Sequence, residues 1–335
     1  MQARRMIRVR WLLAAWWAVV TASVAAWAEE AAEAPVGVPQ AREGRLDIAP
    51  GVVPRPGKGE RLLLEVPGDE PQVALVHVTL GSDVLLTLPT GELKQFPRSQ
   101  TRPTDRPFVG ADEAAMRRAL DEAGVSQFKV TADGPYLYVY DCSEGFYLHT
   151  RSILESMFPG VVRTLRGWGL ELERPTVPQI VVIMPSREAF DAYDKVPPEV
   201  AAYYNQLTNY VVLYEDQRLW EAAPEYAAKQ AAYTIAHEGV HQLLHNTGVQ
   251  QRLSRWPMWI GEGLPEYFCP LKVNTRLVRQ KDAELPTRMI KWTEPGMVND
   301  LRMHALLRID SRGGEVARRL VRENELDTDG YALAW

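Results

Sequence analysis

The feature that most constrains this chain is a long helical pattern that begins at Pro224 and carries the pentapeptide His237-Glu-Gly-Val-His241. Proline suits the first position of a helix, small apolar residues follow to about residue 245, and a glycine three residues later can end the helix. Residues four apart on a helix share one face, so both imidazoles can reach one tetrahedral Zn²⁺. Glu238 points beside them, where it can act as a general base toward a metal-bound water.

The segments before this helix alternate between strands and helices. Apolar spacing predicts a helix over residues 148–165, and the run at 179–184 is typical of a buried strand. A short helix is expected over 187–193 and a second strand over 209–214, directly before the long helix. The order of elements predicts an α+β fold.

Packed core histidines are the simplest alternative to a metal site. The neighbours Ala231, Ala232 and Ile235 are small or apolar, so this part of the helix should be buried, and buried histidines and carboxylates need a partner. Gly239 costs a helix about 1 kcal/mol relative to alanine, which suggests that backbone or substrate approaches closely there. Both observations favour the metal site.

Three residues compete to be the third metal ligand. Glu262 follows His241 by about twenty residues, at the start of a predicted helix, and Glu266 lies one turn after it. His245 lies two turns from His237, about 12 Å along the axis, so it could share a metal with His241 but not with both histidines. The residues themselves leave the choice between the two carboxylates open.

Two paired motifs resemble a known clan. The sequence His237-Glu-Gly-Val-His241-Gln-Leu-Leu-His, followed by Trp259-Ile-Gly-Glu262-Gly-Leu-Pro-Glu-Tyr-Phe, is similar to the gluzincin zinc metallopeptidases. The likeness is strongest to peptidase-MA-like secreted bacterial proteins whose second motif reads Trp-Leu-x-Glu-Gly-x-Ala-Glu-Tyr-Phe, and it covers about residues 145–335. The resemblance implies that His237, His241 and Glu262 bind zinc and that Glu238 is the general base.

The resemblance also implies a fold and a mode of substrate binding. We expect a zincin-like α+β domain with a small sheet against the two motif helices and a β unit ahead of it. Residues 210–214 resemble the edge strand beside the cleft, to which an extended peptide can pair. Pro265 replaces the usual alanine, so the second motif helix should begin at or just before Glu262. Tyr331 and His304 are weak candidates for the residue that stabilises the oxyanion.

The N-terminal residues read as a targeting signal. Residues 1–28 combine four arginines, an uncharged apolar stretch and an Ala26-Trp27-Ala28 cleavage site, so we expect a cleaved signal peptide and a secreted or periplasmic protein of the cell envelope. An uncleaved membrane anchor is the alternative. Residues 29–59 are rich in Ala, Glu, Pro and Gly and predict a linker. The pattern of residues 60–141 predicts a small β-rich region. We expect residues 142–335 to form the peptidase domain, with a possible truncation at its C-terminus.

Charge and cysteine content narrow the partners. Removal of residues 1–28 takes four of the 38 basic residues and none of the 43 acidic ones, leaving 34 against 43, a net charge of −9. So acidic a protein is not expected to bind nucleic acid or anionic lipid. Once the signal peptide is cleaved, no stable membrane insertion is expected. Two cysteines without CxxC spacing leave any metal site to histidine and carboxylate. Cys142 and Cys269 are expected either to pair in a disulfide or to be buried thiols.

Two functions from different classes follow. The first is a secreted zinc metallopeptidase that hydrolyses peptide bonds of a peptide or protein, with Glu238 as general base. The second is a zinc-containing binding or structural protein of the envelope without turnover. Glu238 favours the enzyme, because a purely structural zinc would not need this carboxylate.

Overall fold

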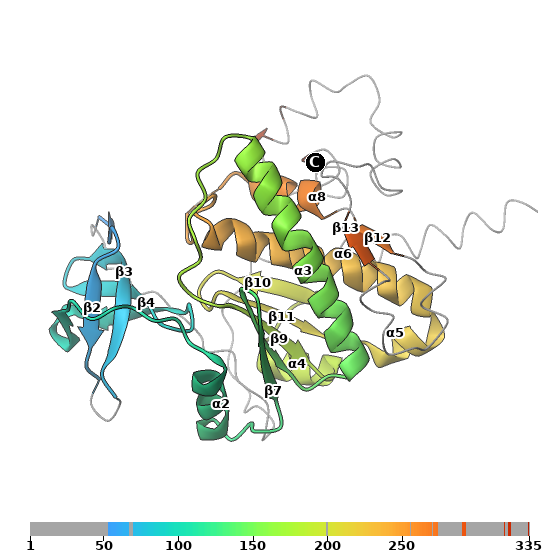
Figure 1. Ribbon diagram of the computed structural model, residues 1–335, viewed down its shortest axis with the longest axis horizontal. Helices are drawn as coiled ribbons and strands as arrows, with labels where there is room; N and C mark the ends of the chain where they lie inside the picture. Colours follow the sequence, from blue (N-terminus) through green and yellow to red (C-terminus); the bar gives the residue numbers. More distant parts are fainter. Residues whose placement is uncertain are drawn as a thin grey trace, which may run out of the picture.

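A computed structural model describes residues 53–66, 70–198, 200–254 and 256–269, the short strands at 271–273 and 290–292, and four isolated positions, 318, 321, 322 and 334. The fold is mixed α+β, as predicted, with two larger β-sheets and helices packed on the second of them (Figure 1). The expected signal peptide, most of the expected linker, His304 and Tyr331 lie outside the described residues. No helix within the described part is long and apolar enough to cross a membrane.

The first sheet forms an N-terminal β unit. It contains β1 (Arg55–Pro56), β2 (Arg61–Leu64), β3 (Gln72–Leu80), β4 (Asp83–Thr87), β5 (Leu93–Pro97) and β6 (Thr101–Pro103), with a 3₁₀ turn, η1 (Arg98–Gln100), before β6. The strand order is β5-β4-β3-β2-β6, and β1 pairs with β3. All of these pairings are antiparallel. Its core consists of aliphatic side chains that point to one side, among them Leu62, Leu64, Ala74, Val76, Val84 and Leu86.

The second sheet has the order β10-β11-β9-β8-β7. Its members are β7 (Lys129–Asp133), β8 (Tyr136–Tyr140), β9 (Gln179–Met184), β10 (Ala202–Asn205) and β11 (Tyr210–Tyr214). The three central strands run parallel, and the two edge strands, β7 and β10, are antiparallel to their neighbours. A third, two-stranded sheet joins β12 (Leu271–Val273) to β13 (Ile290–Trp292).

The structure corrects two expectations about this sheet. The boundary at residue 142 fails, because the β7–β8 hairpin pairs with β9 rather than with the N-terminal β unit. All five residues of β8 are buried, as a central strand requires. The segment 210–214 is not an edge strand either: β11 lies between β9 and β10, so its valines and leucine are buried. The edge strand next to β11 is β10, whose four residues are too few to show the alternating hydrophobic pattern of a strand.

Helices cover both faces of the second sheet (Figure 1). α3 (Glu144–Gly167) and α6 (Pro224–Asn246) pack on one face, while α2 (Glu113–Glu122) and α4 (Arg187–Tyr193) pack on the other. α5 (Gln217–Ala222) precedes α6, and α7 (Met258–Gly261) and α8 (Gly263–Phe268) follow it. The predicted close approach at Gly239 is made by α3, since a Cβ there would lie 2.4 Å from Leu154 Cδ2.

Candidate metal centre

Two segments bring the predicted ligands together. His237 and His241 lie one turn apart on α6, and Glu262 lies between α7 and α8, directly before the first residue of α8. His237 Nε2 is 3.2 Å from His241 Nε2 and 3.2 Å from Glu262 Oε2. His241 Nε2 is 3.3 Å from the same carboxylate oxygen. Three donor atoms from two segments of the chain therefore converge on one point.

The spacing of these atoms suits a shared cation. In a tetrahedral site with bonds of about 2.0–2.1 Å, ligand atoms lie about 3.3–3.4 Å apart, close to all three distances here. Hydrogen bonds from both Nε2–H groups to the carboxylate are the alternative to a shared cation at these distances. The three side chains therefore form a group that can hold a metal ion.

Electrostatics supports the same conclusion. Burial would raise the pKa of Glu262, but the imidazoles of His241 and His237 outweigh burial and hold this pKa far below its usual range. Burial would lower the pKa of His237, but its side-chain hydrogen bonds with Cys269, Glu262 and Glu266 raise it well above its ordinary value. A positive charge among these atoms, from a protonated imidazole or a metal cation, would therefore be stabilised by the carboxylates around it.

Glu266 lies behind the group rather than in it. Its Oε1 is 3.3 Å from His237 Nδ1, the nitrogen that faces away from the converging donors. The same oxygen accepts a hydrogen bond from the hydroxyl of Tyr233, whose ring lies over that of His237 with centroids 6.3 Å apart. A carboxylate at Nδ1 fixes the ring orientation and leaves the Nε2 lone pair for a metal. His237, Glu266 and Cys269 form a second cluster of potential ligand atoms around the outer nitrogen.

The third candidate, His245, points elsewhere. Its Nδ1 lies 3.2 Å from the carbonyl oxygen of Gln250, in the segment after α6. Burial, together with the charges of His241 and Arg252, lowers its pKa to about 3, so this imidazole is neutral at physiological pH. Of the three competing residues, the structure brings only Glu262 to both histidines of the pentapeptide.

Glu238 faces the edge strand of the second sheet. Its Oε2 accepts a hydrogen bond of 2.8 Å from the backbone N–H of Tyr204 in β10. Burial raises its pKa, and the nearby His237 and His241 offset part of this rise. A carboxylate with a raised pKa, held by one oxygen beside a metal-ligand group, has the properties of a general base.

Tyr204 is a site residue that the sequence did not reveal. Its ring stacks on His245, with centroids 5.3 Å apart, and its hydroxyl donates to Asn209 Oδ1 at 2.8 Å. Nothing in the local sequence marks it, because its role comes from the pairing of β10 with β11 beside α6. Cys142 and Cys269 form no disulfide with each other.

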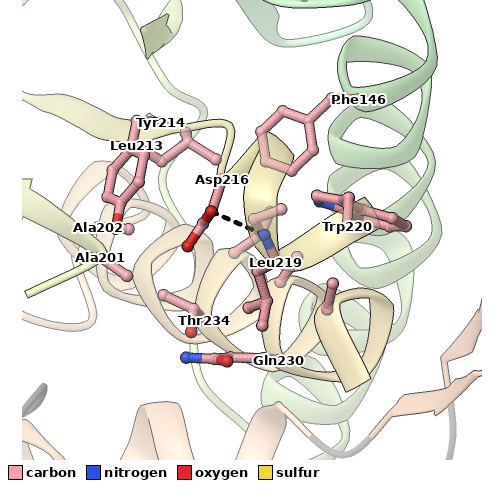
Figure 2. A pocket seen from close by; sticks show the side chains of 13 residues that line it. Phe146, Ala201, Ala202, Leu213, Tyr214, Asp216, Leu219, Trp220, Gln230 and Thr234 are labelled. Carbon is pink, nitrogen blue, oxygen red and sulfur yellow. Dashed lines mark hydrogen bonds between the residues drawn. The ribbon is translucent and has the colours of Figure 1, made fainter. Parts of the chain in front are cut away.

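A pocket opens along α6 beside Gln230 and Thr234 (Figure 2). Thr234 lies four residues before Glu238, and Ala231 and Ala227 continue this stripe, so they line the pocket one to three turns from the carboxylate. The opposite walls come from β10, the end of β11, α5 and α3, which contribute Ala202, Leu213, Trp220 and Phe146. The lining is largely apolar, with Asp216, Gln230 and Thr234 as polar members.

Comparison with known proteins adds one match. Residues 231–335 match the family described as "Protein of unknown function (DUF1570)". The matched segment contains both histidines of the group, Glu238 and Glu262. No curated protein and no solved structure matches the chain.

Proposed function

We propose that this protein is a zinc-dependent metallopeptidase with a zincin-like catalytic domain. The observation that carries the proposal is the convergence of His237 Nε2, His241 Nε2 and Glu262 Oε2 at mutual distances of 3.2–3.3 Å, next to the carboxylate of Glu238. Two imidazoles and one carboxylate are a donor set typical of catalytic zinc, which keeps a fourth position open. The half-buried His241 leaves the group accessible from one side.

Each residue has a distinct role in this proposal. His237, His241 and Glu262 hold the ion, and zinc when bound would supply a Lewis acid and an activated water. Glu238 is held at Oε2 by the Tyr204 N–H, so its other oxygen is available to take a proton from the attacking water and deliver it to the departing amine. Glu266 and Tyr233 orient His237 from behind.

The edge strand supports a peptide as the substrate. β10 pairs with β11 on one side, and its Tyr204 N–H points away from that pairing, toward Glu238. An extended peptide could add by main-chain hydrogen bonds to the outward groups of this edge other than the Tyr204 N–H, which already donates to Glu238, and pass over the metal group. The edge-strand role that the resemblance implied for residues 210–214 therefore passes, in this proposal, to the neighbouring strand β10.

The pocket supports a preference for apolar side chains. Ala202 of β10 and Thr234 of α6 line the pocket, and Tyr204 and Glu238 meet on the same two elements two and four residues later. A side chain of a peptide held along β10 could therefore enter the pocket while its backbone lies beside Glu238. Because Asp216 stands among the lining residues, acidic side chains should be disfavoured there.

One observation favours a second function. The hydrogen bond from Tyr204 engages an oxygen of the carboxylate that catalysis would need, so the group could instead be a zinc-containing binding site without turnover. In that case, zinc would bind as proposed and the edge of β10 would hold a peptide that is not cleaved. The two functions share every residue and differ only in what Glu238 does.

Peptide cleavage separates the two functions. Mature protein prepared from the full chain is loaded with zinc and incubated with a peptide library, and products are identified by mass spectrometry. We expect the wild type to cleave next to large apolar residues. Glu238→Gln should lose this cleavage by several orders of magnitude and keep its zinc content, since Glu238 is not a ligand in this proposal. Glu221→Gln, an exposed glutamate of α5, is the matched control. Zinc binding without any cleavage would support the binding protein.

The proposal includes export from the cytoplasm. The composition of residues 1–28 and the net charge of −9 of the remaining chain support a soluble protein of the periplasm, the envelope or the medium that binds no nucleic acid.

A further inference from the structure

The N-terminal β unit contacts the second sheet at the turn that joins β10 to β11. The backbone N–H of Leu93 donates to the carbonyl oxygen of Leu207 in this turn, at 2.7 Å. The side chain of Leu207 packs among buried leucines of the N-terminal unit, Leu80, Leu85 and Leu93. A polar and an apolar contact thus join the tip of the β10–β11 hairpin to the N-terminal unit.

Arg252 connects the same two parts from the segment after α6. Its guanidinium donates to the carbonyl oxygens of Gln206 at 2.6 Å and Leu207 at 2.9 Å, in the turn, and of Gly91 at 2.7 Å, in the N-terminal unit. The side chain is buried, so these bonds replace its contacts with water. The planar fork of arginine can serve several acceptors in fixed directions, which a lysine could not do.

Gly91 allows the two parts to approach this closely. Its φ of +89° lies in the left-handed region, and a Cβ at this position would lie 2.8 Å from Asn209 Nδ2. Asn209 is fully buried, accepts the Tyr204 hydroxyl and exchanges hydrogen bonds with Asn246 of α6. The contact therefore reaches from the N-terminal unit through Asn209 to the residue that holds Glu238.

We propose that the N-terminal β unit is an internal brace of the candidate metal centre, and that Arg252 is the positioning residue that links it to the β10–β11 hairpin. Braced at its turn, the hairpin keeps the Tyr204 N–H on Glu238 and presents the free edge of β10 beside the metal group. The effect on turnover rests on the proposed function. The coupling between Arg252 and the Tyr204–Glu238 contact does not.

A contact that only adds stability would behave differently from a brace. Its loss would raise the exchange of amides throughout the second sheet, because the whole unit would open more often. Loss of a brace should release β10 and the turn, while the central strands β8 and β9 stay protected. The ligand group, carried by α6 and the segment before α8, should keep its zinc affinity.

Hydrogen exchange on the full mature chain tests this distinction. We compare the wild type with Arg252→Met and with Gly91→Ala, which disturbs the contact from the other side. Arg61→Met is the control, because Arg61 is an exposed arginine of the same unit whose guanidinium donates to a carbonyl at 3.4 Å. We expect the Tyr204 amide to lose protection by about tenfold or more in both test variants, with β8, β9 and zinc affinity unchanged within about twofold.

The proposal is overturned if Tyr204 keeps its protection in Gly91→Ala and Arg252→Met, or if the central strands lose protection equally. Should Arg252→Met fail to fold, Gly91→Ala decides alone. Where cleavage is detected, both variants should lower turnover at unchanged zinc affinity. If neither the wild type nor any variant cleaves a peptide, the proposed function fails. The hydrogen-exchange result still decides whether the N-terminal unit braces β10.

Discussion

Replacement of Glu266 should weaken zinc binding without abolishing it. Oε1 of Glu266 accepts a hydrogen bond from the Tyr233 hydroxyl and lies 3.3 Å from His237 Nδ1, and Glu266→Ala removes both contacts. Loss of a partner behind a ligating histidine typically costs about 10–100-fold in metal affinity, which is about 1.4–2.8 kcal/mol. We expect a loss in this range, because the remaining ligand atoms stay in place while the His237 ring loses its fixed orientation.

Two further variants resolve the two contacts of this oxygen. Glu266→Gln keeps an acceptor of similar shape for His237 and removes the negative charge, so its loss should lie near the lower end of the range. Tyr233→Phe removes only the hydroxyl and should cost less than about tenfold. Competition with a chelator of known affinity measures all three, and thermal unfolding of the metal-free proteins controls for the fold. Wild-type zinc affinity in Glu266→Ala would refute the orienting role.

Four other expectations can be checked independently. Gly239→Ala should destabilise the fold by about 1–3 kcal/mol in urea unfolding, since its Cβ would lie 2.4 Å from Leu154 Cδ2; unchanged stability would contradict the packing of α3 on α6. Burial lowers the pKa of His149 from 6.5 to about 4, so the unfolded state binds more protons between these values. Stability should therefore fall as pH drops through this window, by on the order of 3 kcal/mol, and His149→Gln should flatten the dependence. Protein recovered from its natural source should begin near Glu29 and lie outside the cytoplasm, and an intact Met1 in the membrane fraction would favour the anchor. The Glu238→Gln protein should bind zinc with wild-type affinity, because Glu238 is not one of the three grouped side chains.

The approach of the two histidines to each other could be predicted from the sequence, because it depends on a local rule. A four-residue spacing on a helix fixes the relative position of His237 and His241 wherever that helix packs. Glu262 required the resemblance, since the chain between the two motifs does not reveal how α8 returns to α6. Glu262 and Glu266 differ in which carboxylate faces the Nε2 atoms of the two histidines. That orientation depends on the short helices before and within the second motif, α7 and α8.

The wrong predictions concern strands and residues whose positions depend on contacts between distant parts of the sequence. β8 and β11 were assigned from their own sequences, but strand order depends on long-range contacts that no local pattern records. Tyr204 and Arg252 could not be predicted for the same reason. Tyr204 acts through its own backbone N–H on a side chain of α6, and Arg252 donates to backbone carbonyls of distant segments. Gly239 does mark a close approach, but the neighbours are side chains of α3 rather than the backbone or substrate that the sequence suggests.

Zinc binding by the mature protein tests the central claim most directly. Metal analysis after dialysis against trace zinc, followed by chelator competition, compares the wild type with Glu262→Ala and with Glu221→Ala as an exposed control. We predict one tightly bound Zn²⁺ per chain in the wild type and the control, and loss of tight binding in a still-folded Glu262→Ala. A wild type without stoichiometric zinc, or a Glu262→Ala protein that binds zinc with wild-type affinity, would contradict the site described here.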